Sequence, residues 1–309
     1  MTRTLQWGPE QSRLFERSTE IEDAVMAMKW VARTSVFVAA LAGLTTVTAP
    51  TLGQAPPELR NNKIDFAYVP PKTAKYHAIV DRLKKRQFLE QLSEFVSPVR
   101  LPHPFYLVTV ECGQANAFYS ADQWAIFLCY EWIELMDRMA PPPGQPVEGI
   151  THEDVVIGET VATVLHELGH AAFDILKIPV SGREEDAADQ FMAFIALQFS
   201  KDVARTIVNG EAYFWYNSSN PDAWAQYADE HGTAGQRFYN TLCLAYGGDR
   251  EAFKDFVDKK WLPAERAQNC VSEYEQVKRA FVKTVLPFID QELMKKVQAK
   301  QWLQPQDRR

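Results

Sequence analysis

The chain has 309 residues, of which 46% are hydrophobic and 24% charged, and its formal net charge is −7. This is the composition of an ordinary globular protein, which excludes wholesale disorder and collagen-like repeats. An acidic chain without a long basic run argues against general nucleic-acid binding, so we expect no nucleic-acid partner. Four cysteines are too few for a disulfide-dense scaffold, but they could form two bridges.

Residues 1–55 have the layout of an export signal. Lys29 and Arg33 form a short basic start, the segment from Val36 to Leu44 is apolar, and small residues close the region. This order is typical of a secretory signal peptide, so we expect the protein to be exported, either to the periplasm or out of the cell.

Two points about this region stay open. An uncleaved membrane anchor formed by residues 36–49 is the alternative to a signal peptide, although the apolar stretch is short for a full span. In that case the protein would contact the membrane only through the uncleaved signal. Acidic residues ahead of an export signal are unusual, and they predict that translation starts at Met26 or Met28.

Behind the export region, the sequence predicts a Pro-rich tether over residues 56–72 and a single domain over residues 73–300. The expected elements are, in chain order, helical sequence over 73–96, a strand over 105–111, a hairpin over 116–120 and 124–128, a helix over 129–139 and a loop over 140–149. Helices are expected over most of the chain that follows. A small sheet with an edge strand, followed by a mainly helical half, is an α+β fold.

The sequence His166-Glu167-Leu168-Gly169-His170 is an HExxH motif. Positions i and i+4 share one face of a helix, so both imidazoles can bind one metal ion. Glu167 lies where its carboxylate can take a proton from a metal-bound water. On its own, the motif is equally consistent with a helix that carries two surface histidines.

The residues around the motif predict the helix that it needs. Thr151 and Asp154 form a capping-box pattern, and Val161, Leu165 and Leu168 continue an apolar stripe. The two histidines are therefore expected on one face of a helix that packs into the core.

A catalytic zinc site needs three protein ligands and one open position, and the next predicted helix offers the third ligand. Ser181 and Glu184 form a second capping-box pattern, which uses Glu184 at the helix start and argues against it as a ligand. Glu185 and Asp189 then share a face. Glu185 can bind the metal, and Asp189 can accept a hydrogen bond from the outer nitrogen of a ligand histidine. A solvated acidic helix start is the alternative.

HExxH followed by E-x-x-A-D on the next helix resembles the gluzincin metallopeptidases, and the fold is then zincin-like. The resemblance implies that His166, His170 and Glu185 bind Zn²⁺. It also implies that Glu167 is the general base and then the general acid, and that Asp189 orients a ligand.

A second match lies upstream, where Asn116-Ala117-Phe118-Tyr119 is similar to the edge strand of thermolysin-like enzymes. In those enzymes the strand pairs with an extended peptide, so the resemblance implies that Asn116 and Ala117 bind substrate. An edge strand does offer unpaired N–H and C=O groups to a peptide. A plain hairpin strand is the alternative.

Further segments are together similar to a bacterial family of metallopeptidases known mainly from sequence. They are C-x-x-x-N-A-F-Y, L-C-Y-E, HELGHA, I-P-V-x-G-R-E-E-D-A-A-D-Q, D-E-H-x-x-x-x-Q-R-F-Y-N and R-A-x-x-C. This resemblance spans about residues 60 to 290. The connection from His170 to Glu185 is shorter than in the thermolysin pattern, and no calcium-loop region is evident, so substrate preferences do not carry over.

A peptidase of this type also needs a hydrogen-bond donor for the oxyanion that forms during hydrolysis. His231, Arg237 and Tyr239 are the candidates, and a structural cluster of caps and salt bridges is the alternative.

In an oxidising compartment the four cysteines are expected to pair. Cys112 with Cys129 would close the hairpin, and Cys243 with Cys270 would join two C-terminal helices. The two other connectivities stay open, and zinc ligation by cysteine is a weaker alternative because the chain has no C-x-x-C.

These patterns predict a secreted zinc metallopeptidase that hydrolyses bonds in a peptide or protein substrate. Two other functions stay open: a catalytically silent zincin that acts as a binding module, and a zinc hydrolase of non-peptide amides.

Overall fold

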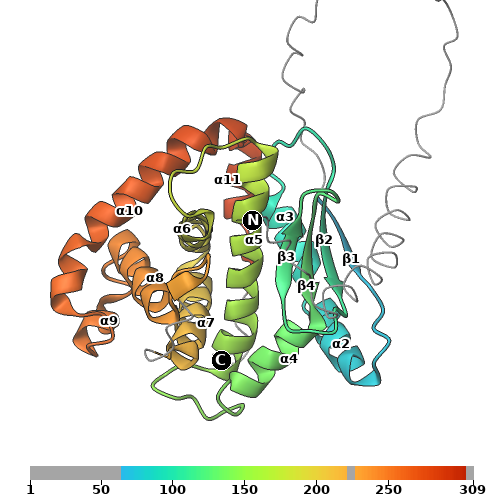
Figure 1. Ribbon diagram of the computed structural model, residues 1–309, viewed down its shortest axis with the longest axis horizontal. Helices are drawn as coiled ribbons and strands as arrows, with labels where there is room; N and C mark the ends of the chain where they lie inside the picture. The colour runs from blue at the N-terminus through green and yellow to red at the C-terminus, as the bar shows by residue number, and fades with distance from the viewer. Residues whose placement is uncertain (1–63, 221–226, 304–309) are drawn as a thin grey trace, which may run out of the picture. The chain divides into compact units, whose positions relative to one another are not determined.

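The computed structural model describes residues 64–303 except 221–226. The expected export signal, the proposed start at Met26 or Met28 and the first part of the expected tether lie outside the described residues. Figure 1 shows a small sheet on one side of a long central helix and a group of helices on its other side.

The sheet has four strands in the order β1-β2-β4-β3. The strands are β1 (Ile64–Tyr68), β2 (Phe105–Val110), β3 (Ala117–Ser120) and β4 (Ala125–Cys129). β1, β2 and β4 run parallel, whereas β3 pairs antiparallel with β4 and forms an edge. The central strands β2 and β4 are buried along their whole length, as expected for apolar strands covered on both faces.

Strand β1 lies within the predicted tether, so that prediction is wrong for residues 64–68. Ile64 is buried, and the hydroxyl of Tyr68 donates to Glu90 at 2.7 Å and accepts from the Leu89 amide at 2.9 Å. A short strand next to proline-rich sequence gives a weak local pattern, and pairing with β2 decides its structure.

The helical sequence predicted over 73–96 is divided into three pieces. They are η1 (Ala74–Tyr76), α2 (His77–Lys85) and α3 (Phe88–Val96). The last two are separated at Gln87, whose φ of 53° lies in the left-handed region and stops a helix. The apolar stripe is nevertheless buried, because both α2 and α3 turn their apolar sides to the core.

α4 (Tyr130–Met139) follows β4 directly, and a loop leads to η2 (Asp154–Gly158) and α5 (Glu159–Ile175). The capping box predicted at Thr151 is present. The Thr151 amide donates to the Asp154 carboxylate at 2.9 Å, and the Asp154 amide donates to the Thr151 hydroxyl at 3.0 Å. α5 is the central helix of Figure 1 and contacts β3 and β4 on one side and α6 and α7 on the other.

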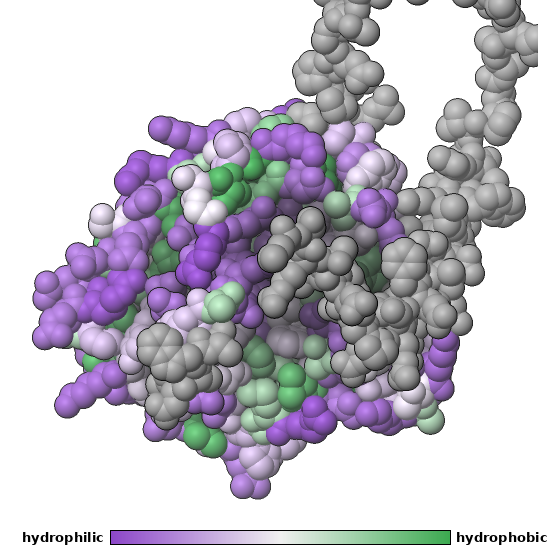
Figure 2. All heavy atoms as spheres, in the orientation of Figure 1, coloured by the Kyte–Doolittle hydropathy of each residue, from purple (hydrophilic) through white to green (hydrophobic). Residues whose placement is uncertain are grey.

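Helices make up the rest of the described chain. They are α6 (Glu184–Ala196), α7 (Lys201–Ser218), α8 (Ala234–Gly248), α9 (Lys254–Asp258), α10 (Ala264–Thr284), η4 (Leu286–Phe288) and α11 (Gln291–Gln298). α10 is an outer helix, and hydrophilic side chains dominate the surface over it in Figure 2. The α+β fold predicted from the sequence, with a small sheet before a helical half, is confirmed.

α7 crosses the junction of η2 and α5 at very close range. A Cβ atom at Gly158 would collide with the carbonyl oxygen of Thr206, and one at Gly210 would collide with the carbonyl oxygen of Asp154. Both positions therefore require glycine, because any side chain would push the two helices apart. This crossing fixes α7 against the start of the HExxH helix.

Two disulfides are present, Cys112–Cys129 and Cys243–Cys270. The first ties the segment after β2 to the last residue of β4, and the second joins α8 to α10. Two disulfides are typical of a protein outside the reducing cytosol. Among the described residues, no helix combines the length and apolar character that crossing a membrane requires.

Candidate metal centre and active site

The HExxH motif lies in the middle of α5, and its two histidines point to the same side. Their Nε2 atoms are 3.2 Å apart, as the i and i+4 spacing predicts. His166 is 7% exposed, whereas His170 is half-buried. The opposite side of the helix carries Val161 and Leu165, which are buried in the core. Apolar packing thus fixes the rotation of α5 and turns both imidazoles toward α6.

α6 brings two carboxylates to these histidines. Glu185 Oε2 lies 3.0 Å from His166 Nε2 and 3.3 Å from His170 Nε2. Asp189, one turn further along, places Oδ1 2.8 Å from His166 Nδ1. The helices approach closely because Ala188 faces Gly169, where an added Cβ would lie 3.1 Å from the Ala188 Cα. We call His166, His170, Glu185 and Asp189 the histidine–carboxylate cluster.

The three inner atoms of this cluster have the spacing of ligands on one ion. The His166–His170, His166–Glu185 and His170–Glu185 distances are 3.2, 3.0 and 3.3 Å. Atoms bound about 2.0–2.1 Å from a tetrahedral zinc ion lie about 3.3 Å from one another. Two imidazole nitrogens and one carboxylate oxygen are also a donor set that catalytic zinc sites use. The residues present therefore fit a zinc ion.

Glu184 behaves differently from the sequence-based expectation. α6 begins at Glu184 with Arg183 as its N-cap residue, and Ser181 makes no capping bond to it, so the capping box predicted there is wrong. Gly182, with φ of 101°, turns the chain before the helix and leaves Ser181 outside its first turn. The Glu184 carboxylate instead lies 2.8 Å from His170 Nδ1, with its side chain 55% exposed.

Charges in the histidine–carboxylate cluster compensate one another. Burial lowers the pKa of the His166 imidazole, but hydrogen bonds to Asp189 and Glu185 outweigh it and raise that pKa to about 9. Burial acts to raise the pKa of Glu185, yet contacts with His166, His170 and His231 hold it well below its usual range. The imidazoles and the Glu185 carboxylate thus favour one another's charged forms, and a bound metal ion would take over the role of the imidazole protons.

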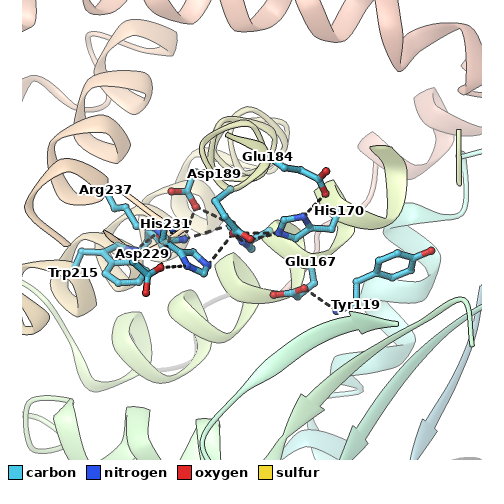
Figure 3. A network of polar contacts seen from close by, with 12 residues as sticks. Tyr119, Glu167, His170, Glu184, Asp189, Trp215, Asp229, His231 and Arg237 are labelled. Atoms are coloured by element: carbon cyan, nitrogen blue, oxygen red, sulfur yellow. Dashed lines mark hydrogen bonds and ion pairs between the residues drawn. The ribbon is translucent and has the colours of Figure 1, made fainter. Parts of the chain in front are cut away.

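Glu167 points from α5 toward Tyr119 on the edge strand (Figure 3). The backbone N–H of Tyr119 on β3 donates to Glu167 Oε2 at 2.8 Å. Burial of this carboxyl raises its pKa, and the Tyr119 amide and the two histidines oppose that rise. The Tyr119 side chain is itself held by Asp174, which accepts from its hydroxyl at 2.8 Å. β3 therefore fixes the position of the Glu167 carboxylate.

The structure separates the three residues predicted as oxyanion donors. His231 lies at the cluster, with Nε2 2.9 Å from Glu185 Oε2 and Nδ1 2.8 Å from Asp229 Oδ1. Arg237 reaches it from α8, where Nη2 donates to Asp189 Oδ1 at 2.5 Å. Tyr239 does not reach it and is 42% exposed. Residues two positions apart on a helix face nearly opposite ways, so α8 cannot present both Arg237 and Tyr239 to the cluster.

The residues predicted to bind substrate line a cavity that the cluster borders through His166. It has a volume of about 410 Å³, and Asn116, Ala117, His166, Glu167 and His231 are among its lining residues. The Asn116 carbonyl accepts from the Cys129 amide at 3.1 Å, which places Asn116 at the start of the hairpin ladder. The N-A-F-Y segment therefore forms an edge of the sheet that borders the candidate active site.

Sequence reasoning missed a second group of residues that line this cavity. It comprises Trp132 on α4, Glu159 and Thr163 on α5, and Glu211 and Trp215 on α7. A signal for part of it exists in the sequence, because Glu159, Thr163 and His166 are spaced to share one helix face. The contribution of α7 follows only from the helix crossing at Gly158 and Gly210, which no local pattern predicts.

Comparison with known proteins agrees with this geometry. Residues 68–285 match the protein family DUF4344, whose description reads "Putative metallopeptidase". No curated protein and no solved structure matches the chain. The match covers well over half of the sequence and includes the HExxH helix, the edge strand and the residues of α6 that face them. The chain therefore belongs to this family of putative metallopeptidases.

Proposed function

We propose that the protein hydrolyses peptide bonds with a zinc ion held by His166, His170 and Glu185. The observation that carries this proposal is the triangle of 3.2, 3.0 and 3.3 Å formed by their inner ligand atoms. Metallopeptidases of the family to which the chain belongs require a metal ion, and this donor set suits zinc. When bound, zinc supplies the Lewis acidity that polarises a carbonyl group and activates a water molecule.

In the proposed reaction, Glu167 takes the proton of the attacking water and passes it to the leaving amine. The Tyr119 amide at 2.8 Å keeps the carboxylate in place for both transfers. Asp189 holds the His166 ring through Nδ1, so Nε2 is directed at the metal site. The pair Asp229–His231 supplies an N–H donor beside Glu185, where the oxyanion develops.

The edge strand favours a peptide as the substrate. β3 has a partner strand on one side alone, and alternate N–H and C=O groups on its other side are directed away from β4. Of these groups, the Tyr119 N–H donates to Glu167, so a peptide would pair with the others. An extended peptide can add to such an edge through backbone hydrogen bonds. Because β3 also borders Glu167, a peptide bound there would pass in front of the proposed base.

The test compares cleavage of a quenched-fluorescent peptide library by the wild type and by Glu167→Gln, each with its zinc content measured. We expect the variant to keep zinc and to lose roughly 10²- to 10⁴-fold in turnover. Glu292→Gln removes an equal charge from an exposed side chain of α11 and serves as the matched control. Equal cleavage by Glu167→Gln would contradict the assigned base. Zinc-loaded wild type that cleaves no peptide would favour a binding module or a hydrolase of non-peptide amides.

We also propose that the protein is exported. The order of basic, apolar and small residues in positions 28–55 supports a signal peptide, and the disulfides Cys112–Cys129 and Cys243–Cys270 need an oxidising compartment. N-terminal sequencing of protein from the cell envelope and the medium tests this. A product cleaved somewhere between Ala49 and Ala55 is expected, and an intact N-terminus would indicate an anchor.

A further inference from the structure

The cavity beside the histidine–carboxylate cluster contains more negative charge than the proposed chemistry uses. Glu159 and Glu211 line it together with Glu167 and His166, so both lie in the cavity that holds the proposed base. They are almost fully buried, with exposures of 1% and 3%. We call this region, lined by Glu159, Glu211, Trp132 and Trp215, the acidic cavity.

The backbone forces these two carboxylates together. Gly158-Glu159 and Gly210-Glu211 are identical dipeptides on the two crossing segments, and their glycines form the close contact between η2 and α7. The residue that follows each glycine is therefore held near the crossing. Two acids in this arrangement repel one another when both are ionised, which makes the pairing unfavourable unless one of them keeps its proton or a cation lies between or beside them.

The hydrogen bonds around the two acids are incomplete. The Trp215 indole N–H donates to Glu211 Oε1 at 2.6 Å, and the Thr163 hydroxyl donates to Glu159 Oε1 at 3.3 Å. Oε2 of Glu159 is buried and receives no N–H or O–H from another type of side chain or from the backbone among the described residues, although the neighbouring Glu211 carboxyl can share a proton with Glu159. A buried carboxylate oxygen without such a donor costs free energy, so its presence points to a ligand that donates to it.

The arginine that lines this cavity already pairs with an acid outside the Glu159–Glu211 pair. Arg237 is the only lysine or arginine among the described residues that line it, and its guanidinium pairs with Asp189 and stacks on Trp215, 3.8 Å from the ring centre. Burial and the adjacent Glu211 raise the pKa of Glu159 well above its ordinary value. Without a cation beside it, Glu159 therefore tends to keep its proton, and a cation bound next to both acids would stabilise their ionised forms.

Other groups that line the cavity can bind the backbone and the side chain of a peptide. Trp132 Nε1 and Arg237 Nε are buried donors that find no acceptor in the part of the chain that the structure describes, and a peptide backbone supplies carbonyl acceptors for such donors. Tryptophan rings also favour cations near their faces, and Trp132 and Trp215 both line the cavity. Carboxylates, indoles and a volume of about 410 Å³ fit a long basic side chain.

We propose that the acidic cavity binds a lysine or arginine side chain of the substrate next to the bond that is cleaved, with Glu159 and Glu211 as the residues that select it. This proposal rests on the proposed peptidase function, because it assigns a substrate class to the same site. Glu159 and Glu211 act in binding and take no part in proton transfer.

The first experiment measures binding, so that it does not depend on turnover. Two peptides that differ at one position, lysine against the uncharged norleucine of equal chain length, are titrated into zinc-loaded Glu167→Gln protein by calorimetry. The position is moved along the peptide in a matched series. At one position we expect the lysine peptide to bind at least about tenfold more tightly, as charged hydrogen bonds imply. A glutamate peptide at that position should bind more weakly than both.

The second experiment assigns the preference to the two acids. Glu159→Gln and Glu211→Gln, each in the Glu167→Gln background, are expected to reduce the lysine-to-norleucine affinity ratio to less than about threefold. Glu292→Gln, which removes a charge far along the chain on exposed α11, should leave the ratio unchanged. If one glutamine variant fails to fold, the other variant still tests the proposal. So does the first experiment, in which Glu159 and Glu211 are both unchanged.

The outcomes separate this proposal from the proposed function. Equal affinity for lysine and norleucine peptides at every position, or tighter binding of glutamate peptides, overturns the acidic cavity as a cation site. Cleavage by the wild type without a preference for basic residues also overturns it, while the peptidase function stands. A lysine preference in binding without any cleavage supports the cation site and contradicts hydrolysis.

Discussion

The histidine–carboxylate cluster and the acidic cavity, which meet at His166, differ in how their polar atoms are satisfied. In the histidine–carboxylate cluster, both ring nitrogens of His166 and of His170 have partners between 2.8 and 3.3 Å. In the acidic cavity, the outer oxygen of Glu159 has no N–H or O–H donor outside the Glu159–Glu211 pair among the described residues. The first region is arranged around a point that one small ion can fill, whereas the second is arranged to be completed by a larger ligand.

The largest effect is expected from the substitution that removes the proposed third ligand from the cluster. Glu185→Ala should weaken zinc binding by more than about 100-fold, which exceeds what partners outside the ligand set contribute. Glu184→Ala, with a side chain that is 55% exposed, should weaken it far less. Competition with a chromophoric chelator measures both affinities. If Glu184→Ala weakened zinc binding more than Glu185→Ala, the third ligand would be Glu184 and not Glu185.

A smaller effect is expected from the partner of His166. Asp189→Asn should weaken zinc binding by roughly 10- to 100-fold, because the ring of His166 is no longer held. It also leaves the Arg237 guanidinium buried without its carboxylate, so the free energy of unfolding should fall by about 3 kcal/mol.

Urea denaturation measures this loss of stability. Asp186→Asn is the matched control, since its pair with Arg183 lies at the surface and is expected to contribute less than about 1 kcal/mol. Equal losses in the two variants would show that the buried Asp189–Arg237 pair contributes no more to stability than a surface ion pair.

The smallest effect is expected in the acidic cavity. Glu159→Gln should change the free energy of unfolding by less than about 1 kcal/mol, because its outer oxygen has no N–H or O–H donor outside the Glu159–Glu211 pair to lose among the described residues. The same urea titration gives this value beside that of Asp189→Asn. A loss comparable to that of Asp189→Asn would mean that Glu159 supports the fold, and the contrast between the two regions would disappear.

The sequence predicts the parts of the site that depend on local spacing. His166, His170 and Glu167 follow from helical periodicity, and Glu185 with Asp189 follows from the same rule on the next helix. The structure brings all five residues together. Hairpin, edge strand and cysteine pairing were similarly accessible, because turn signals and short separations limit the alternatives.

Other features depend on contacts between distant segments. The strand at Ile64–Tyr68 forms against β2, the helix break at Gln87 has no glycine or proline to mark it, and Gly182 moves the start of α6 past Ser181. Tyr239 could be excluded as a donor only once the rotation of α8 was known. The acidic cavity needs the crossing of η2 and α7, which no window of sequence contains.

At that crossing, the residues that set the backbone are different from the residues proposed to select the substrate. Gly158 and Gly210 set the distance between the segments, whereas the neighbouring Glu159 and Glu211 project from a backbone that is already fixed. Paired replacements at 159 and 211 can therefore alter what the cavity accepts while the helices stay where they are. On the proposed function, substitutions at these two positions would be enough to change the cleavage preference, and the backbone around the proposed zinc site would stay unchanged.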